Sequence, residues 1–176
     1  MSLAQSREFI LREQFFSMRN RVDIFSSYNE PIGYFESKPF QMRKRFWLRE
    51  LDGDGLLAVV QRMGFTTTFD MYEAGPDIAP ERNNPVGRLK QKFGLRPIFY
   101  FTSNNPMFDF EIEGNFWGME FNIVSRGQII AQISKSFWTF RDTYGVRIYA
   151  NIPDLFAMSI LTAVIVLYWD AEQAER

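Results

Sequence analysis

The chain of 176 residues contains neither cysteine nor histidine. Without cysteine it has no disulfide, no thiol nucleophile and no thiolate metal site. Without histidine it lacks Ser-His-Asp triads, His-Glu zinc sites and the usual general base near neutral pH. A Ser-Lys pair or two carboxylates remain open, but no sequence feature marks a substrate for either. We therefore assign no catalytic, cofactor-binding or metal-binding residue, and we predict a protein that is not an enzyme and uses no cofactor.

An excess of charge of either sign is also missing, since 20 Lys and Arg residues face 21 Asp and Glu residues. No global field therefore indicates nucleic acid as a partner, although a local basic patch remains compatible with an anionic surface. The opening "MSLAQSREF" has no apolar signal core, and Ser2 stands where myristoylation needs a glycine. We expect a cytoplasmic location.

The body of the sequence consists of short apolar or aromatic runs separated by turn residues. The chain has 19 Phe residues, which indicates a well-packed globular core. Many runs alternate in polarity with period two, as half-buried strands do. We predict one domain from residue 8 to 170, with tails at 1–7 and 171–176. Strands are predicted at 21–27, 32–37, 45–51, 56–62, 66–72, 96–102, 108–114, 119–125, 128–134 and 145–151.

The run "IPDLFAMSILTAVIVLYWD" at 152–170 raises the choice between a membrane span and a buried helix. The 15 residues from Leu155 to Trp169 carry no charge. They form about 22 Å of helix, which is short of a hydrocarbon core of about 30 Å. The flanking residues Asp154 and Asp170 are acidic, and Pro153 suits a first helical turn. A helix that is apolar on every face must be buried on every face. We interpret the segment as a core helix, so the predicted class is all-β with one C-terminal helix.

The stretch "LDGDGL" at 51–56 superficially resembles a calcium loop. An EF-hand needs a further Asp or Asn where Leu56 stands, and a Glu where Met63 stands. Helices would also have to flank the loop, whereas strands are predicted on both sides. We interpret the stretch as a tight Asp-Gly hairpin turn.

A degenerate pattern recurs along the chain. A small residue follows a turn, an apolar residue comes two positions later, and a cation and then an aromatic residue follow. It occurs at 33–40, 58–65, 87–93 and 131–137, and in the second of these the four positions are Ala58, Val60, Arg62 and Phe65. We interpret it as the second strand of a hairpin, with the cation directed outward and the aromatic residue turned back toward the core.

Two longer passages resemble a known family. "REQFFSMRNRVDIFSSYNEPIGYFESKPF", followed by "WLRELDGDGLLAVVQRMGF", resembles the opening of the LURP-one-related family. "FEIEGNFWGMEFNIVSRGQIIAQISKSF" resembles its second half. The family is similar in fold to the tubby C-terminal domain and to the phospholipid scramblases. The resemblance implies a closed barrel of about twelve mostly antiparallel strands, with a hydrophobic C-terminal helix through its centre.

The resemblance also gives the basic clusters a candidate role. In tubby-like proteins, basic residues on the barrel surface hold phosphoinositide head groups. The candidates here are Arg43, Lys44 and Arg45 in one cluster, and Lys90 and Lys92 in the other. The alternative is ordinary solvated charge on strands and turns. Scramblases carry an acidic, calcium-associated stretch before the last helix, but "TYGVRIYANIPD" has only Asp154 there, which argues against calcium-dependent lipid movement.

Phe116 and Trp117 lie between two glycines in "GNFWGMEF". Two aromatic residues at a hairpin tip are suited to a lipid interface or a partner protein, and they are equally suited to covering an open barrel end. Base stacking on nucleic acid is not expected, because the chain is near neutral and has no recognition motif.

Three functions remain open from the sequence. The first is a cytoplasmic binding protein that contacts anionic phospholipids, peripheral to the membrane rather than spanning it. The second is a protein-interaction or regulatory module without a lipid role. The third is a scramblase-like lipid-moving protein. An interior ligand cavity of the lipocalin kind is not expected, because the helix fills the lumen.

Overall fold

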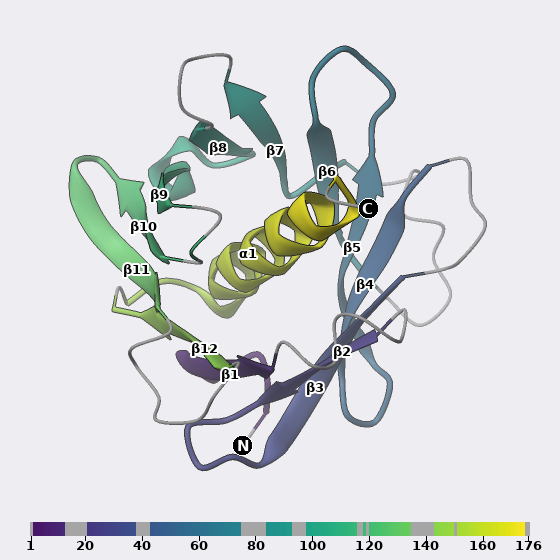
Figure 1. Cartoon of the computed structure of the whole chain (residues 1–176), viewed down its shortest axis with the longest axis vertical. Helices are drawn as coiled ribbons and strands as arrows, with labels where there is room; N and C mark the ends of the chain where they lie inside the picture. The colour runs from purple at the N-terminus through teal and green to yellow at the C-terminus, as the bar shows by residue number, and fades with distance from the viewer. Residues whose placement is uncertain are drawn as a thin grey trace.

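The computed structural model describes residues 2–12, 21–37, 43–74, 84–92, 98–115, 118, 120–134, 143–149 and 151–174, with helix side chains described up to residue 169. The described residues form twelve strands, one 3-10 helix and one α-helix (Figure 1). The strands are β1 (Glu8–Arg12), β2 (Arg21–Phe25), β3 (Pro31–Ser37), β4 (Arg45–Glu50), β5 (Gly55–Gln61), β6 (Thr68–Glu73), β7 (Gly87–Lys92), β8 (Ile98–Ser103), β9 (Phe110–Asn115), β10 (Glu120–Ser125), β11 (Gln128–Ser134) and β12 (Thr143–Ile148).

Each strand pairs antiparallel with the next strand along the chain, and the sheet closes on itself. The closure joins β1 to β12, in a register that sets Glu8 opposite Arg147 and Leu11 opposite Tyr144. Closure leaves the sheet without an unpaired edge. This confirms the closed, antiparallel barrel that the family resemblance implies.

The strands alternate between the lumen and the outside, as their sequence pattern predicts. In β9, Phe110 and Ile112 are buried in the core, while Glu111 and Glu113 between and after them are exposed. Each predicted strand segment overlaps an observed strand. β1 was not predicted, and β7 was indicated only by the recurring pattern at 87–93, not by alternation of polarity. β1 reads "EFILR", with three buried residues in a row, and β7 reads "GRLKQK", with Leu89 as its one large apolar residue.

The helix α1 (Asp154–Ala174) runs along the axis of the barrel (Figure 1). Every side chain from Phe156 to Tyr168 is buried, on all faces of the helix. At its C-terminal part, Trp169 packs edge-on against Phe46 of β4, with ring centroids 5.9 Å apart. At its start, Phe156 stacks on Phe108 with centroids 3.9 Å apart. The segment is therefore a core helix. Among the described residues, no helix is both long and apolar enough for a membrane span.

The start of the helix is tied to the segment that precedes β1. The Arg7 guanidinium donates to the Asp154 carboxylate at 2.7 Å and to the Ile152 carbonyl at 3.0 Å. Leu3 is fully buried, and its N–H donates to the Glu50 carboxylate at 2.8 Å. Asp154 also lies in the first helical turn, where a carboxylate meets the positive end of the helix dipole.

The turn between β4 and β5 confirms the hairpin interpretation of "LDGDGL". The Glu50 N–H donates to the Asp54 carbonyl at 2.9 Å, and the Gly53 N–H donates to the Glu50 carbonyl at 3.1 Å. Gly53 has φ of 97°, in the region that favours glycine.

Deleting the helix should abolish cooperative unfolding. A chain that stops after Ile152 loses the whole buried face of α1. Each buried side chain of this kind costs about 2–5 kcal/mol when cut back to alanine, whereas a domain has about 5–15 kcal/mol of stability in total. Thermal unfolding followed by circular dichroism checks this, with a chain ending at Ala174 as the control. A shortened chain that still melts cooperatively would show that the barrel stands without its helix.

Replacing Thr162 with valine should stabilise the protein. Thr162 is fully buried in α1, and its hydroxyl oxygen has no hydrogen-bond partner. Because an unpaired buried hydroxyl carries a desolvation cost, its removal should add about 1 kcal/mol. A chain of this size should then melt roughly 2–4 °C higher. Thr162→Ser keeps the hydroxyl and loses the methyl group, so it should melt lower than the wild type. A valine variant that melts lower would mean that the hydroxyl makes an interaction in solution.

Candidate functional site

One end of the barrel brings the two predicted basic clusters together around a single hairpin. We call this end the hairpin rim, defined as residues 43–45, 61–68 and 90–92. On one side, the Gln61 N–H donates to the Lys44 carbonyl at 2.9 Å. On the other, Thr68 lies opposite Lys90, and the Gln91 N–H donates to the Thr67 carbonyl at 3.1 Å. The hairpin between β5 and β6 extends beyond the strands, near the C-terminus of α1 (Figure 1).

The hairpin tip carries two large apolar side chains in solvent. Phe65 is fully exposed, at 105%, and Met63 is 73% exposed. The interpretation that Phe65 turns back toward the core is therefore wrong. The tip lies beyond the end of the lumen, so no barrel interior is within reach of it. Neither residue was predicted as functional. The available signal was the pairing of Met63 and Phe65 around Gly64 in a turn that needs no apolar residue.

The cations of the rim differ in how they are placed. Arg43 and Lys92 are exposed, whereas Lys44, Arg45 and Lys90 are half-buried. The ion pairs between described side chains include neither Arg43, Lys90 nor Lys92. These three charges are therefore not neutralised by any acidic side chain in the part of the chain that the structure describes.

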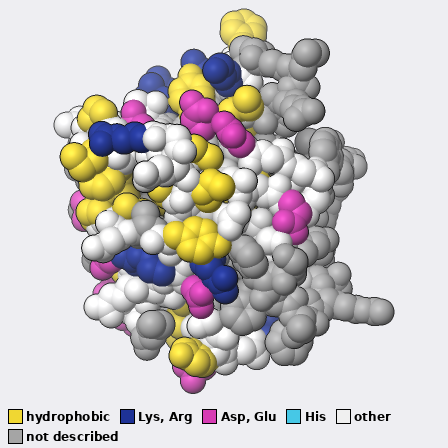
Figure 2. Space-filling model, turned by 90° about the vertical axis from the view of Figure 1, so that its left-hand side faces the viewer, with side chains coloured by type: hydrophobic (Ala, Val, Ile, Leu, Met, Phe, Trp, Pro, Cys, Tyr) yellow, Lys and Arg dark blue, Asp and Glu magenta, His cyan; other side chains and the backbone are white. Residues whose placement is uncertain are grey.

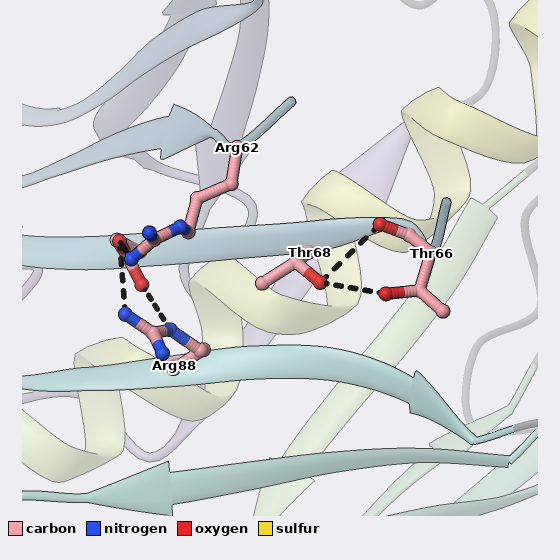
Figure 3. A network of polar contacts seen from close by, with 5 residues as sticks. Arg62, Thr66, Thr68 and Arg88 are labelled. Carbon is pink, nitrogen blue, oxygen red and sulfur yellow. Dashed lines mark hydrogen bonds and ion pairs between the residues drawn. The ribbon is translucent and has the colours of Figure 1, made fainter. Parts of the chain in front are cut away.

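A buried carboxylate anchors the base of the hairpin. Asp70 lies on the outer face of β6, yet its side chain is only 6% exposed. Arg88 of β7 donates to it through Nε at 2.6 Å, and Arg62 donates through Nη1 at 3.2 Å (Figure 3). The hydrogen bond to Asp70 raises the pKa of Arg88 above its ordinary value, against the opposing effect of burial. Arg62 and Arg88 thus hold the fold rather than offer free charge.

Threonines complete the bracing of the hairpin. The Arg62 N–H donates to the Thr68 carbonyl at 2.8 Å. The Thr68 hydroxyl donates to the Thr66 carbonyl at 3.3 Å, and the two threonine hydroxyls are 3.3 Å apart (Figure 3). These contacts close the hairpin just below its tip. The apolar tip is therefore held outward by hydrogen bonds and ion pairs at its base.

A shallow hollow continues from the rim along the outside of β7 and β8. It has a volume of about 480 Å³, and the side chains that line it include Arg88 and Lys90. Lys90 lies at its rim end, and Asn104 lies at the far end. The hollow also contains the hydroxyl groups of Tyr100 and Thr102, which can donate to an anion.

Charges of both signs are mixed over β9 to β11. Figure 2 faces this side, and its Lys and Arg side chains are intermixed with Asp and Glu and with exposed hydrophobic ones. The described atoms there present no area of one sign. At the rim, by contrast, cations without an acidic partner among the described residues lie beside an apolar tip.

The rim presents cations and exposed apolar side chains. Among the described residues, no group of three or more acidic side chains could hold a metal ion. The five predicted cations all lie at the rim, although the sequence did not show that they converge. Phe116 and Trp117 lie outside the described residues.

Comparisons with known proteins fit this architecture. The sequence model of the LURP-one-related family matches residues 7–165. A protein of Arabidopsis thaliana, solved by X-ray crystallography, is similar in structure with a TM-score of 0.65. The match covers 94% of this chain and 91% of that one at 10% sequence identity, so it shows a shared fold. No curated protein matches the sequence.

Asp70→Asn should destabilise the protein by about 3 kcal/mol, the lower part of the cost of breaking a buried ion pair, because both arginines lose their counter-charge but remain half exposed. Unfolding in urea measures the change. Glu113→Gln removes one carboxylate from an exposed position and should stay within about 0.5 kcal/mol of wild type. Equal midpoints for the two variants would contradict the anchoring role of Asp70.

Proposed function

Because the chain belongs to the LURP-one-related family, and folds as a barrel closed around its own helix, we propose that it is a non-enzymatic binding protein that contacts anionic phospholipid head groups through the hairpin rim. In this proposal the protein is cytoplasmic and attaches peripherally to a membrane surface.

One observation carries the proposal. Basic clusters that are far apart in the sequence flank a hairpin tip with exposed Phe65 and Met63. Cations near an anionic leaflet each contribute about 1 kcal/mol. Burying a Phe or Met side chain contributes about 1.5–3 kcal/mol when complete. Arg43, Lys90 and Lys92 have no acidic partner among the described residues. Together with a partly inserted tip, they support weak, reversible attachment, comparable to one myristoyl chain.

The same geometry favours binding over the movement of lipids. The barrel lumen is filled by α1, whose side chains from Phe156 to Tyr168 are buried against the strands. A lipid would have to displace this core to pass through. A head group can reach the rim, by contrast, without any rearrangement of the barrel.

Sedimentation with vesicles tests the proposal. Wild-type protein should sediment with vesicles that contain phosphatidylserine, and not with pure phosphatidylcholine. The binding should weaken as salt rises, because exposed charges are screened beyond about 8 Å at physiological ionic strength. Replacing Arg43, Lys90 and Lys92 with serine should weaken binding roughly a hundredfold, since about 3 kcal/mol is lost. Met63→Ser with Phe65→Ser should weaken it roughly tenfold, through loss of apolar burial.

Arg126→Gln provides the control, because Arg126 lies at the other end of the barrel and should bind like wild type. All variants should melt near the wild-type temperature, since the changed side chains lack ion pairs among the described residues. Equal binding by wild type and the triple variant would refute a role of the rim. If wild type does not bind at low salt either, a protein-interaction role replaces the lipid role.

A further inference from the structure

The barrel end opposite the hairpin rim contains a small, largely apolar pocket. It has a volume of about 250 Å³. It lies between the 3-10 helix η3 (Pro106–Phe108), the turn from β10 to β11, and the start of α1. Its walls are hydrophobic side chains from η3, β9, β11, α1 and the segment before α1, namely Met107, Phe108, Phe110, Ile130, Ile152, Phe156 and Ile160. The pocket thus joins a strand turn, a short helix and the core helix at one place.

The pocket has a rigid back wall. The rings of Phe108 and Phe156 stack with centroids 3.9 Å apart and planes 20° apart. Phe108 is fixed in turn, because its N–H donates to the Asn105 carbonyl at 2.9 Å. The Asn105 side chain also caps η3, accepting from the Met107 N–H at 3.1 Å. The apolar walls are therefore formed before any ligand arrives.

The mouth of the pocket is polar and carries one charge. Ser125, Arg126, Gln128 and Asn151 line it, and no acidic side chain does. Arg126 is exposed, and it forms none of the ion pairs between described side chains. Glu111 and Glu113 line an adjacent hollow together with Arg126, but neither is paired with it among the ion pairs between described side chains. Two other nearby acids have partners of their own. The Asp109 carboxylate accepts from the Ser103 N–H at 2.7 Å, and Asp154 pairs with Arg7 at 2.7 Å.

The backbone at the mouth holds Arg126 in an unusual conformation. Arg126 has φ of 52° and Gly127 has φ of 76°, so both residues of this two-residue turn are left-handed. Such turns favour Asn, Asp or Gly at the first position. Strained positions of this kind cluster at ligand sites. A cation therefore stands where local backbone preference favours a small polar residue.

We propose that this pocket binds a small amphipathic carboxylate, with its apolar body against Phe108 and Phe156 and its carboxylate at Arg126 and Gln128. The size sets the class of ligand. An engineered apolar cavity of about 150 Å³ holds benzene, whereas sites for drug-sized ligands begin at about 300 Å³. One aromatic ring with a short tail fits between these limits. A guanidinium group recognises a carboxylate through paired hydrogen bonds, and the Gln128 amide can add a further donor.

The site is independent of the hairpin rim, which lies at the other end of α1. Because Phe156 and Ile160 belong to the core helix, the pocket exists only in the folded barrel. A ligand that binds only the folded state raises the melting temperature as its concentration rises.

Three probes with the same body and different ends test the proposal on the full chain. 3-Phenylpropionate should bind with a dissociation constant of about 1 mM or below, measured by calorimetry, and should raise the melting temperature. 3-Phenylpropanol, which lacks the charge, should bind roughly tenfold more weakly. 3-Phenylpropylamine, which carries the opposite charge, should not bind detectably.

Variants test separately the contributions of the Arg126 charge and of the apolar cavity to binding. Arg126→Gln should weaken binding of 3-phenylpropionate roughly tenfold and leave that of 3-phenylpropanol unchanged. Met107→Trp should fill the mouth from an exposed position and abolish binding of both. Arg43→Gln, at the far end of the barrel, should bind like wild type. The proposal is overturned if 3-phenylpropionate fails to bind wild type, if the three probes bind equally, or if Arg126→Gln binds the carboxylate as wild type does.

Discussion

The structure depends on the need to enclose a helix that is apolar on every side. Residues Phe156 to Tyr168 of α1 have no polar face to turn toward water, so a sheet on one side would leave half of the helix exposed. A closed barrel covers all sides at once, and its inward positions meet the same apolar surface. Helix and barrel therefore explain each other: the strands need a filled lumen, and the helix needs a wall all round.

Because α1 fills the lumen, we expect binding sites at the ends and on the outside of the barrel. The two ends differ in chemistry, although the same helix supports both. Near Trp169, the hairpin rim combines an exposed apolar tip with cations that have no acidic partner in the part of the chain that the structure describes. Near Phe156, aromatic side chains form a small pocket with Arg126 at its mouth. The ion pairs of Asp70 hold the hairpin of the rim outward. They therefore determine which side chains the hairpin exposes.

The sequence predicted much of the fold because period-two alternation and helix length are local properties. β1 was missed since Phe9, Ile10 and Leu11 are all buried. Alternation of polarity did not show β7, since its outward residues are polar and its inward ones few, and only the recurring pattern at 87–93 indicated it. The arrangement of the candidate site is not a local property. The cation clusters can be seen in the amino-acid sequence. Their convergence, however, depends on how the strands from β4 to β7 pair with one another. The roles of Asp70 and Phe65 depend on that pairing as well, so no local pattern showed them.

The seam between β1 and β12 has a consequence for how the chain folds. All the other strand pairs join strands that are neighbours in the sequence. These hairpins can therefore form from nearby residues while the barrel is still open. The seam instead joins residues that are far apart in the sequence, such as Glu8 and Arg147. The entropy cost of closing so long a loop is offset only once the intervening strands have formed. The helix comes after β12 in the chain. Partly folded forms therefore expose the inward phenylalanines longest, and these intermediates are the species most prone to aggregate.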